Sequence, residues 1–215
     1  AALARGVPLG AGGSRLLRGN HPEHEALEAE AASFFGSETA LYFPTGFAAN
    51  AALFAALPRR EDLIVHDALI HASVRDGFDP ARVATVEVPH NDVTAMADAI
   101  RQWRANGGTG RAWIAVETLY SMDGDRAPLE DLMALADATD SMLVLDEAHA
   151  TGVLGPGGAG LSALAPGGVD LVMGTFSKAF GGFGAYVAGS RAMIDWLVNG
   201  CSGLIYTTAL PPAVL

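Results

Sequence analysis

The chain is poor in several features that would each point to a class of protein. It has one cysteine, Cys201, so no disulfide can form within it, and this suits a reducing cytosol. No apolar run is long enough to span a membrane, and the first residues lack the apolar core of a signal peptide. The net charge is −11 and the only adjacent basic pair is Arg59-Arg60, which argues against nucleic acid as the main partner. We therefore expect a cytoplasmic protein with neither a membrane nor a nucleic acid as its partner.

Lysine is almost absent too, because Lys178 is the single lysine beside twelve arginines. Arginine keeps its proton in proteins, whereas a lysine amine can lose its proton in a desolvated site and attack a carbonyl. Upstream, the apolar run Leu143-Val-Leu ends in Asp146. A lysine that forms an imine and a strand-end carboxylate that pairs with a pyridinium nitrogen together indicate pyridoxal phosphate (PLP). The alternative is a surface lysine in an arginine-rich proteome.

The distribution of apolar residues predicts one large α/β domain. Half of the 215 residues are hydrophobic, which is enough for a substantial core. Short apolar segments alternate with segments of helical periodicity, so we expect a mostly parallel seven-stranded sheet with crossover helices. The expected strands are residues 40–43, 63–65, 83–88, 113–116, 142–145, 171–173 and 185–188. The expected helices are residues 24–35, 47–57, 92–104, 129–137 and 191–199, and Asn91-Asp92 supplies the N-cap of the third.

Polar residues follow five of these strands. In a parallel sheet, functional groups gather outside the carboxyl ends of the strands, so these residues should meet at one edge. The five groups are Thr45, His66-Asp67, Glu117 to Ser121, Asp146 to His149, and Thr175 to Lys178. Their coincidence is a stronger indication of a site than any one of them.

The segment Thr45-Gly46-Phe47 reads as a tight turn that opens a helix. The free N–H groups and the dipole of a helix N-terminus stabilise a phosphate, and the glycine lets the backbone approach it. An ordinary strand–helix turn would look the same. His71 can stack on a flat cofactor ring, although a lone histidine among apolar residues is more often part of a core. Similarly, the Asp- and Gly-rich turn after Glu117 either aims the Ser121 hydroxyl at a phenolate-like oxygen or is a solvated loop.

The run Asp146-Glu-Ala-His149 also matches the Asp-Glu-Ala-His motif of DEAH-type helicases. In those helicases the motif holds Mg²⁺ opposite a phosphate-binding G-x-x-x-x-G-K-[ST] loop. This chain lacks such a loop, so we reject the helicase interpretation and expect no metal. With PLP, Asp146 would keep the ring nitrogen protonated and His149 would reach the 3-oxygen of the ring. Thr175 would hold the phosphate while Lys178 reaches the aldehyde carbon. The match of Gly155-Pro-Gly-Gly-Ala-Gly160 to G-x-G-x-x-G is accidental, because no helix follows it.

Taken together, these residues closely resemble the α-oxoamine synthases, which are PLP enzymes of the aspartate-aminotransferase fold (fold type I). Three stretches are most similar to the members that act in biotin synthesis: residues 10–15, 89–93 and 204–212. Glycine C-acetyltransferase, 5-aminolevulinate synthase and serine palmitoyltransferase are the sister alternatives. The resemblance runs through nearly the whole chain, in the segments Gly10-Ala-Gly-Gly-Ser-Arg15, His24-Glu-Ala-Leu-Glu28, Thr45-Gly-Phe-Ala-Ala-Asn50, Asp67-Ala-Leu-Ile-His71-Ala-Ser73, Pro89-His-Asn-Asp-Val93, Ser121-Met-Asp-Gly-Asp125, Asp146-Glu-Ala-His149-Ala-Thr-Gly152, Thr175-Phe-Ser-Lys178 and Leu204-Ile-Tyr-Thr-Thr208-Ala-Leu-Pro-Pro212.

The resemblance implies a role for each matching residue. Lys178 would carry the cofactor and Asp146 would pair with its ring nitrogen, while His71 would stack on the ring and contact the substrate. The remaining cofactor contacts would be Ser121 and His149 at the 3-oxygen, Thr175 with the backbone of Gly46 and Phe47 at the phosphate, and Thr208 at the phosphate of the neighbouring subunit in a homodimer with sites at the interface.

Two positions depart from the family pattern. Family members often carry arginine where this chain has Ala159, which would alter a packing contact or an interface salt bridge. Some carry glycine where it has Ser177. The chain has no initiating methionine and stops where the sequence predicts the start of a helix, so we expect a piece of a longer protein. In that piece, residues 1–30 lead into the domain and residues 31–215 form the PLP-binding large domain, without the C-terminal small domain.

The implied reaction is a decarboxylative condensation of an amino acid, L-alanine for the biotin branch, with an acyl-CoA, there pimeloyl-CoA. Lys178, once displaced by the amino acid, would remove its α-proton as general base. The carbanion would attack the thioester, coenzyme A would leave, and the β-keto acid would lose CO₂. The more distant alternatives are another fold-type-I enzyme such as an aminotransferase, and a PLP-binding domain without catalysis.

Overall fold

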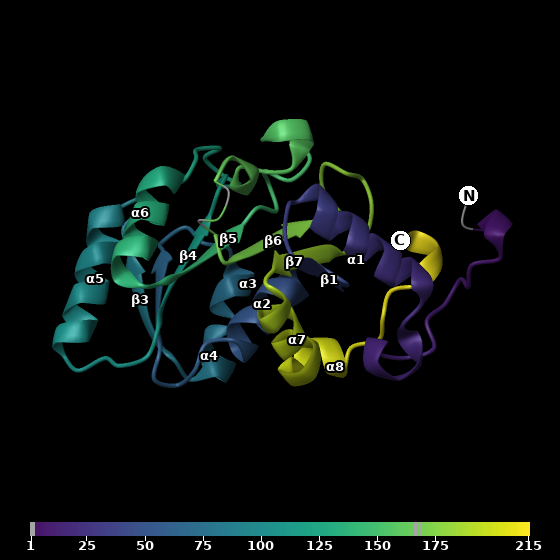
Figure 1. Cartoon of the computed structure of the whole chain (residues 1–215), viewed down its shortest axis with the longest axis horizontal. Helices are drawn as coiled ribbons and strands as arrows, with labels where there is room; N and C mark the ends of the chain where they lie inside the picture. The colour runs from purple at the N-terminus through teal and green to yellow at the C-terminus, as the bar shows by residue number, and fades with distance from the viewer. Residues whose placement is uncertain (1–2, 166, 168) are drawn as a thin grey trace.

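The chain folds around one mixed sheet with helices on both faces, as the computed structural model in Figure 1 shows; the structure describes residues 3–165, 167 and 169–215. The strand order is β1-β7-β6-β5-β4-β2-β3. β7 runs opposite to the other strands of this sheet, which is therefore mostly parallel, as predicted. The strands are β1 (Thr39–Phe43), β2 (Leu63–Asp67), β3 (Ala84–Val88), β4 (Ala112–Glu117), β5 (Met142–Asp146), β6 (Leu171–Thr175) and β7 (Ala185–Gly189).

Two hydrophobic layers sandwich the sheet, and alternate residues of each strand supply them. On one face, Ile64, Val144 and Met173 pack against α2 and the helices beside it. This layer is the larger part of the core. On the other face, Val65 and Leu145 pack under α5 and α6, and α1 covers the β1–β7 end. The helices are α1 (Pro22–Phe34), α2 (Gly46–Ala56), α3 (Ala72–Arg75), α4 (Phe78–Ala81), α5 (Val93–Ala105), α6 (Leu129–Thr139), α7 (Arg191–Gly200) and α8 (Ser202–Ile205).

Local capping explains where three of the long helices begin. The side chains of Thr45, Asp92 and Ser190 accept hydrogen bonds from the backbone N–H three residues on, at the starts of α2, α5 and α7. The predicted cap in Asn91-Asp92 is therefore confirmed, and it is Asp92 that forms it. At the end of α6, Asp140 takes a left-handed conformation with φ of 47° and closes the helix.

The predicted elements all exist, but several predicted strand ends were wrong. β2, β4, β5 and β6 continue to Asp67, Glu117, Asp146 and Thr175, so these polar residues are the last of their strands and do not follow them. Pairing extends to these residues because the hydrogen bonds of a sheet join backbone N–H and C=O groups of neighbouring strands, and the side chain plays no part in them. The short helices α3, α4 and α8 had no sequence periodicity long enough to predict them.

Three further features complete the description of the fold. Ser14 and Thr208 form an isolated antiparallel bridge, which joins segments from near the two ends of the chain. None of the helices in the described part of the chain has the length and apolar character that crossing a bilayer requires. The glycine-rich segment after β5 forms a 3₁₀ turn at Pro156–Gly158, without the strand–helix geometry of a dinucleotide site, as predicted.

Candidate active site at the carboxyl ends of the strands

A cavity of about 250 Å³ opens where β1, β5 and β6 end and α2 begins. The position follows from the sheet, because parallel strands bring their carboxyl ends to one edge. Most of the residues predicted for the site line it together, although they lie far apart in the chain. The lining residues are Thr45, Gly46, Phe47, Asn50, His71, Ser73, Asp146, Ala148, His149, Met173, Thr175, Ser177 and Lys178.

Lys178 reaches into this cavity from the turn after β6. Its Nζ lies 2.8 Å from Nε2 of His149, which comes from the turn after β5. Burial lowers the pKa of Lys178 below its usual 10.5, against the opposing attraction of Asp146 and Glu117. Burial, and then the lysine charge, also lower the pKa of His149. The lowered pKa values make a neutral amine and a neutral imidazole easier to form here than in water, and neutral lysine is the form that acts as a nucleophile or base.

Asp146 is buried and held by two donors. Its Oδ1 accepts from the backbone N–H of Ala148 at 2.9 Å, and its Oδ2 accepts from Nδ2 of Asn50 at 2.7 Å. The same amide donates to Oγ of Ser73 at 3.0 Å, and that hydroxyl lies 2.7 Å from Nδ1 of His71. A line of polar contacts thus fixes the carboxylate and the His71 ring relative to each other. Asn50 and Ser73 stood in motifs quoted from the sequence, but their roles were missed because only the fold places them against Asp146.

The opposite side of the cavity presents hydroxyl groups and a helix N-terminus. Thr175 is buried; its Oγ1 donates to the carbonyl of Gly184 at 2.8 Å and lies 2.7 Å from Oγ of Ser177. Gly46 opens α2, and Phe47 is half exposed beside it. Free N–H groups, the helix dipole and hydroxyl groups are together a suitable setting for a phosphate. The serine at 177, a departure from the family pattern, adds a hydroxyl here.

Glu117 lies behind His149; the sequence placed it in one of the five edge groups but gave it no role of its own. It ends β4, is 2% exposed, and lies next to Asp146 in the paired strand. Burial, followed by the charge of Asp146, raises its pKa to about 8. A carboxyl group that stays protonated near neutral pH beside a cavity is typical of a functional site.

Two predicted site residues lie elsewhere. Ser121 is exposed in the loop after β4, and Thr208 is exposed in the segment after α8; neither lines the cavity. Their roles at the 3-oxygen and at a neighbouring subunit stay predictions. Ala159 is buried, 6% exposed, in the glycine-rich segment, where the small side chain is accommodated in packing.

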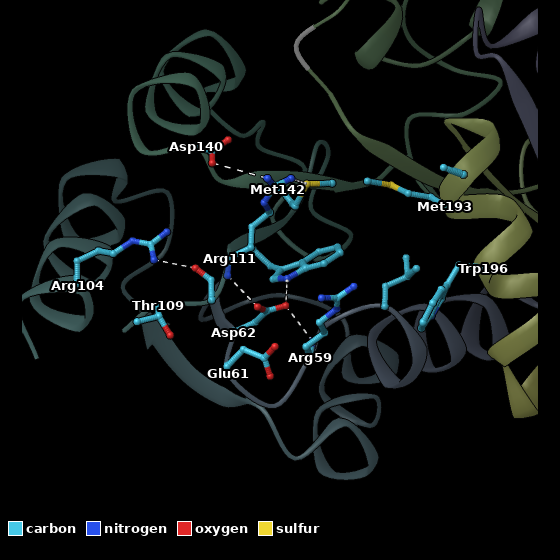
Figure 2. Close-up of a pocket in the computed structure, with 14 residues that line it drawn as sticks. Arg59, Glu61, Asp62, Arg104, Thr109, Arg111, Asp140, Met142, Met193 and Trp196 are labelled. Atoms are coloured by element: carbon cyan, nitrogen blue, oxygen red, sulfur yellow. Dashed lines mark hydrogen bonds and ion pairs between the residues drawn. The ribbon is translucent and has the colours of Figure 1, made fainter. Parts of the chain in front are cut away.

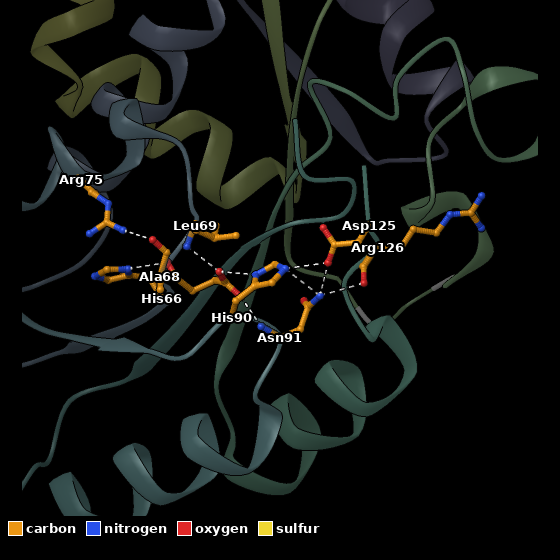
Figure 3. A network of polar contacts seen from close by, with 9 residues as sticks. His66, Ala68, Leu69, Arg75, His90, Asn91, Asp125 and Arg126 are labelled. Atoms are coloured by element: carbon orange, nitrogen blue, oxygen red, sulfur yellow. Dashed lines mark hydrogen bonds and ion pairs between the residues drawn. The ribbon is translucent and has the colours of Figure 1, made fainter. Parts of the chain in front are cut away.

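The expected edge group His66-Asp67 serves a different purpose, which Figure 3 shows. Asp67 is fully buried and accepts from the backbone N–H of Asn91 at 2.7 Å. Its other oxygen lies 2.9 Å from Nδ1 of His90, whose Nε2 lies 2.7 Å from Asp125. His66-Asp67 lies at the expected edge, because β2 ends at Asp67, but neither residue lines the cavity, and Asp67 ties the loop that carries Asp125 to the end of β2.

A larger cavity of about 720 Å³ lies at the opposite edge, where β2, β4 and β5 begin (Figure 2). Its buried carboxylate, Asp62, accepts from the backbone N–H groups of Arg59 and Arg111 and from Nε1 of Trp113. All three contacts join neighbouring segments of the fold, so Asp62 is a structural residue. Within the described residues, no three His, Cys, Asp or Glu side chains are grouped to hold a metal ion.

Comparisons with known proteins show which family the chain is similar to. The model of the family "Aminotransferase class I and II" matches residues 1–215. The 8-amino-7-oxononanoate synthase of Gluconacetobacter diazotrophicus is 51% identical over 214 residues, which are 96% of this chain and 53% of that protein. The serine palmitoyltransferase from S. paucimobilis with a bound PLP–myriocin aldimine superposes with a TM-score of 0.89 at 32% identity, over 95% of this chain and 51% of that one.

A third similar protein, 8-amino-7-oxononanoate synthase from Francisella tularensis, has a TM-score of 0.76 at 30% identity, over 90% of this chain and 56% of that one. The chain spans about half the length of the curated relatives it matches. These relatives confirm the resemblance to α-oxoamine synthases and the expected fold. From its fold, its site and the match over its whole length, the chain belongs to the aminotransferase class I and II family.

Proposed function

We propose that this protein is a PLP-dependent acyltransferase that condenses L-alanine with pimeloyl-CoA, or the equivalent carrier-protein thioester, as in biotin synthesis. The observation that carries the proposal is the meeting of the single lysine, Lys178, with His149 and Asp146 in one cavity. Similar proteins named 8-amino-7-oxononanoate synthase support the choice of substrates. We further propose a cytoplasmic protein in which residues 31–215 form the PLP-binding large domain.

The residues present fit the cofactor. Lys178 offers an amine open to the cavity, and Asp146 a buried carboxylate whose two donors fix its position. At the far end, Thr175 and the start of α2 at Gly46 and Phe47 would hold the phosphate. When bound, PLP supplies an electron sink for negative charge at the α-carbon of an amino acid.

The side chains of this protein would then have separate roles in the reaction. Burial lowers the pKa of Lys178, so its amine gives up its proton more readily than a lysine in water and can then accept one from the amino acid. His149 touches the amine and would keep its orientation, and Asp146 would hold the charge of the ring nitrogen. The His71 ring, fixed by Ser73 and placed near Phe47, would cover one side of the cavity and limit the entry of water. Ser121 and His149 would donate to the 3-oxygen.

The partners follow from the same proposal. The substrates are an amino acid and an acyl-CoA, and a second copy of the chain would complete each site. Thr208 lies outside the cavity of its own chain and is exposed, which leaves it available to the phosphate site of a neighbouring subunit. No metal enters the proposed reaction.

Release of coenzyme A tests the proposal. The protein with PLP is mixed with pimeloyl-CoA and L-alanine, and free thiol is measured over time. We expect thiol release that needs both substrates and is lost in Lys178→Ala, with the circular dichroism spectrum unchanged. Conversion of the cofactor to pyridoxamine phosphate without acyl-CoA would show an aminotransferase, and no turnover with bound PLP would show a binding domain; either result contradicts the proposal.

A serine palmitoyltransferase-like activity is the second candidate, because serine palmitoyltransferase structures superpose with a TM-score of 0.89. The same assay separates the two. Faster thiol release with L-serine and palmitoyl-CoA than with L-alanine and pimeloyl-CoA would favour the second candidate, and faster release with glycine would favour the glycine-using sister enzymes.

A further inference from the structure

Two buried atoms behind Lys178 face each other without a hydrogen bond. Oε2 of Glu117 and Nδ1 of His149 are each buried and without a hydrogen-bond partner, and they lie 3.4 Å apart. The other ring nitrogen of His149, Nε2, is 2.8 Å from Nζ of Lys178. The imidazole therefore stands between a buried carboxyl group and the reactive amine. An unsatisfied polar group in such a place costs about 1–3 kcal/mol, so a pair of them calls for a function.

A neutral imidazole carries one hydrogen, on either nitrogen, and its neighbours decide which. If Glu117 is ionised, it can only accept, so the hydrogen belongs on Nδ1 and Nε2 offers a lone pair to the cavity. If Glu117 is protonated, its O–H donates to Nδ1, and the hydrogen moves to Nε2, which then donates into the cavity. When Lys178 is neutral, the protonation of Glu117 thus decides whether its amine meets a donor or an acceptor; a charged Lys178 can only donate and therefore favours the lone pair on Nε2.

We propose that Glu117 is a positioning residue that sets the tautomer of His149: its protonated carboxyl donates to Nδ1 and leaves the ring hydrogen on Nε2, facing Lys178 and the cavity. The proposal deepens the proposed function, since it rests on Lys178 and His149 being the reacting pair. An Nε2–H can donate to a neutral lysine amine and to an oxygen of a bound ligand. The other tautomer can do neither.

The surroundings of Glu117 favour the protonated form. Burial is the largest effect, and the negative charges of Asp146 and Asp67 add to it, so the pKa rises to about 8. Lys178 opposes this when charged, but burial lowers its own pKa. His149 is neutral above pH 7, because burial lowers its pKa below 6.5. The titratable side chains that face Glu117 are Asp67, Tyr120, Asp146, His149 and Lys178.

The tautomer can be read directly in the protein without cofactor. Long-range ¹H–¹⁵N spectra of ¹⁵N-histidine-labelled protein show which ring nitrogen carries the hydrogen, and the chain has only six histidines. The signals of His149 are assigned by their loss in His149→Asn. In Lys178→Met, which removes the amine that competes for Nε2, we expect Nε2–H at pH 7, in about tenfold excess, the size of one net hydrogen bond. Above pH 8, where Glu117 loses its proton, we expect a change to Nδ1–H.

Two substitutions at Glu117 test whether this residue is the cause. Glu117→Gln keeps the shape of the side chain but has no proton to lose, and Glu117→Leu has no polar group. In both, the pH-dependent change of tautomer should disappear. Glu130→Gln, the same substitution on an exposed residue of α6, should leave it unchanged, and Lys178→Met should retain it.

The outcomes are separate from those of the proposed function, because no cofactor or turnover is involved. Nδ1–H in Lys178→Met at pH 7 would overturn the proposal, and so would a change of tautomer that persists in Glu117→Gln. If neither Glu117 variant folds, the spectra of Lys178→Met across the pH range still decide. A protein that shows the expected tautomers but never binds PLP would refute the proposed function alone.

Discussion

Asn50 should contribute more to stability than any exposed asparagine, because its amide is the side-chain donor to a buried carboxylate. In Asn50→Ala, Asp146 loses the 2.7 Å hydrogen bond and Ser73 loses the one at 3.0 Å. A hydrogen bond to a charged group contributes about 1.5–3 kcal/mol and a neutral one about 0.5–1.5 kcal/mol. We therefore expect the free energy of unfolding to fall by about 3 kcal/mol, which lowers Tm by roughly 6–12 °C in a chain of this size.

Urea denaturation followed by circular dichroism measures this change, with Asn199→Ala as the matched control. Asn199 is also helical but exposed, and its amide donates only to a backbone carbonyl of its own helix. Its replacement should alter the free energy of unfolding by less than about 0.5 kcal/mol. If Asn50→Ala were as stable as the control, the account of how Asp146 is held would be refuted.

Three more perturbations follow from single contacts. Glu28→Gln weakens the largely buried pair with Arg15, held by contacts of 2.8 and 3.0 Å, and should cost about 3 kcal/mol in urea denaturation. Burial lowers the pKa of His90, but the hydrogen bonds that its ring donates to two aspartates outweigh this effect and raise the pKa above 6.5. The stability that wild type has over His90→Gln should therefore be full below pH 6.5 and shrink as pH rises through the raised pKa; a constant difference from pH 6 to 9 would contradict this. Gly184→Ala puts a Cβ against the Tyr42 hydroxyl at a φ of +80°. Thermal melting should therefore show a loss of about 2–4 kcal/mol, and an unchanged Tm would refute the clash.

The sheet and its long helices could be predicted because the periodicity of apolar residues reports burial on one or both faces. The run from Met142 to Leu145, for example, is buried throughout. Strand ends were harder, since pairing with a neighbour carries Asp146 and Thr175 into the ladder despite their polar side chains. The helices α3, α4 and α8 are each four residues long, which is too short for a period to show.

The chemistry of the site was predictable where a residue type is rare or its position unusual. The lone Lys178 and the strand-end Asp146 both belong to the cavity that the structure shows. The role of Glu117 was not recognised, since a carboxylate after an apolar strand looks like the start of a solvated loop. Its burial depends on the pairing of β4 with β5, and so on contacts distant in sequence. Asp67 illustrates the reverse case, in which a strand-end carboxylate supports a loop and does not line the cavity.

The most direct test of the central claim is to find which residue takes up the cofactor. The protein is mixed with PLP, its absorbance spectrum is recorded, and the complex is reduced with borohydride before peptide mapping. The account predicts an imine absorption band that disappears on reduction, with the added mass on Lys178. A protein with no such band, or with the label on no lysine, would contradict the claim that this cavity is a PLP site.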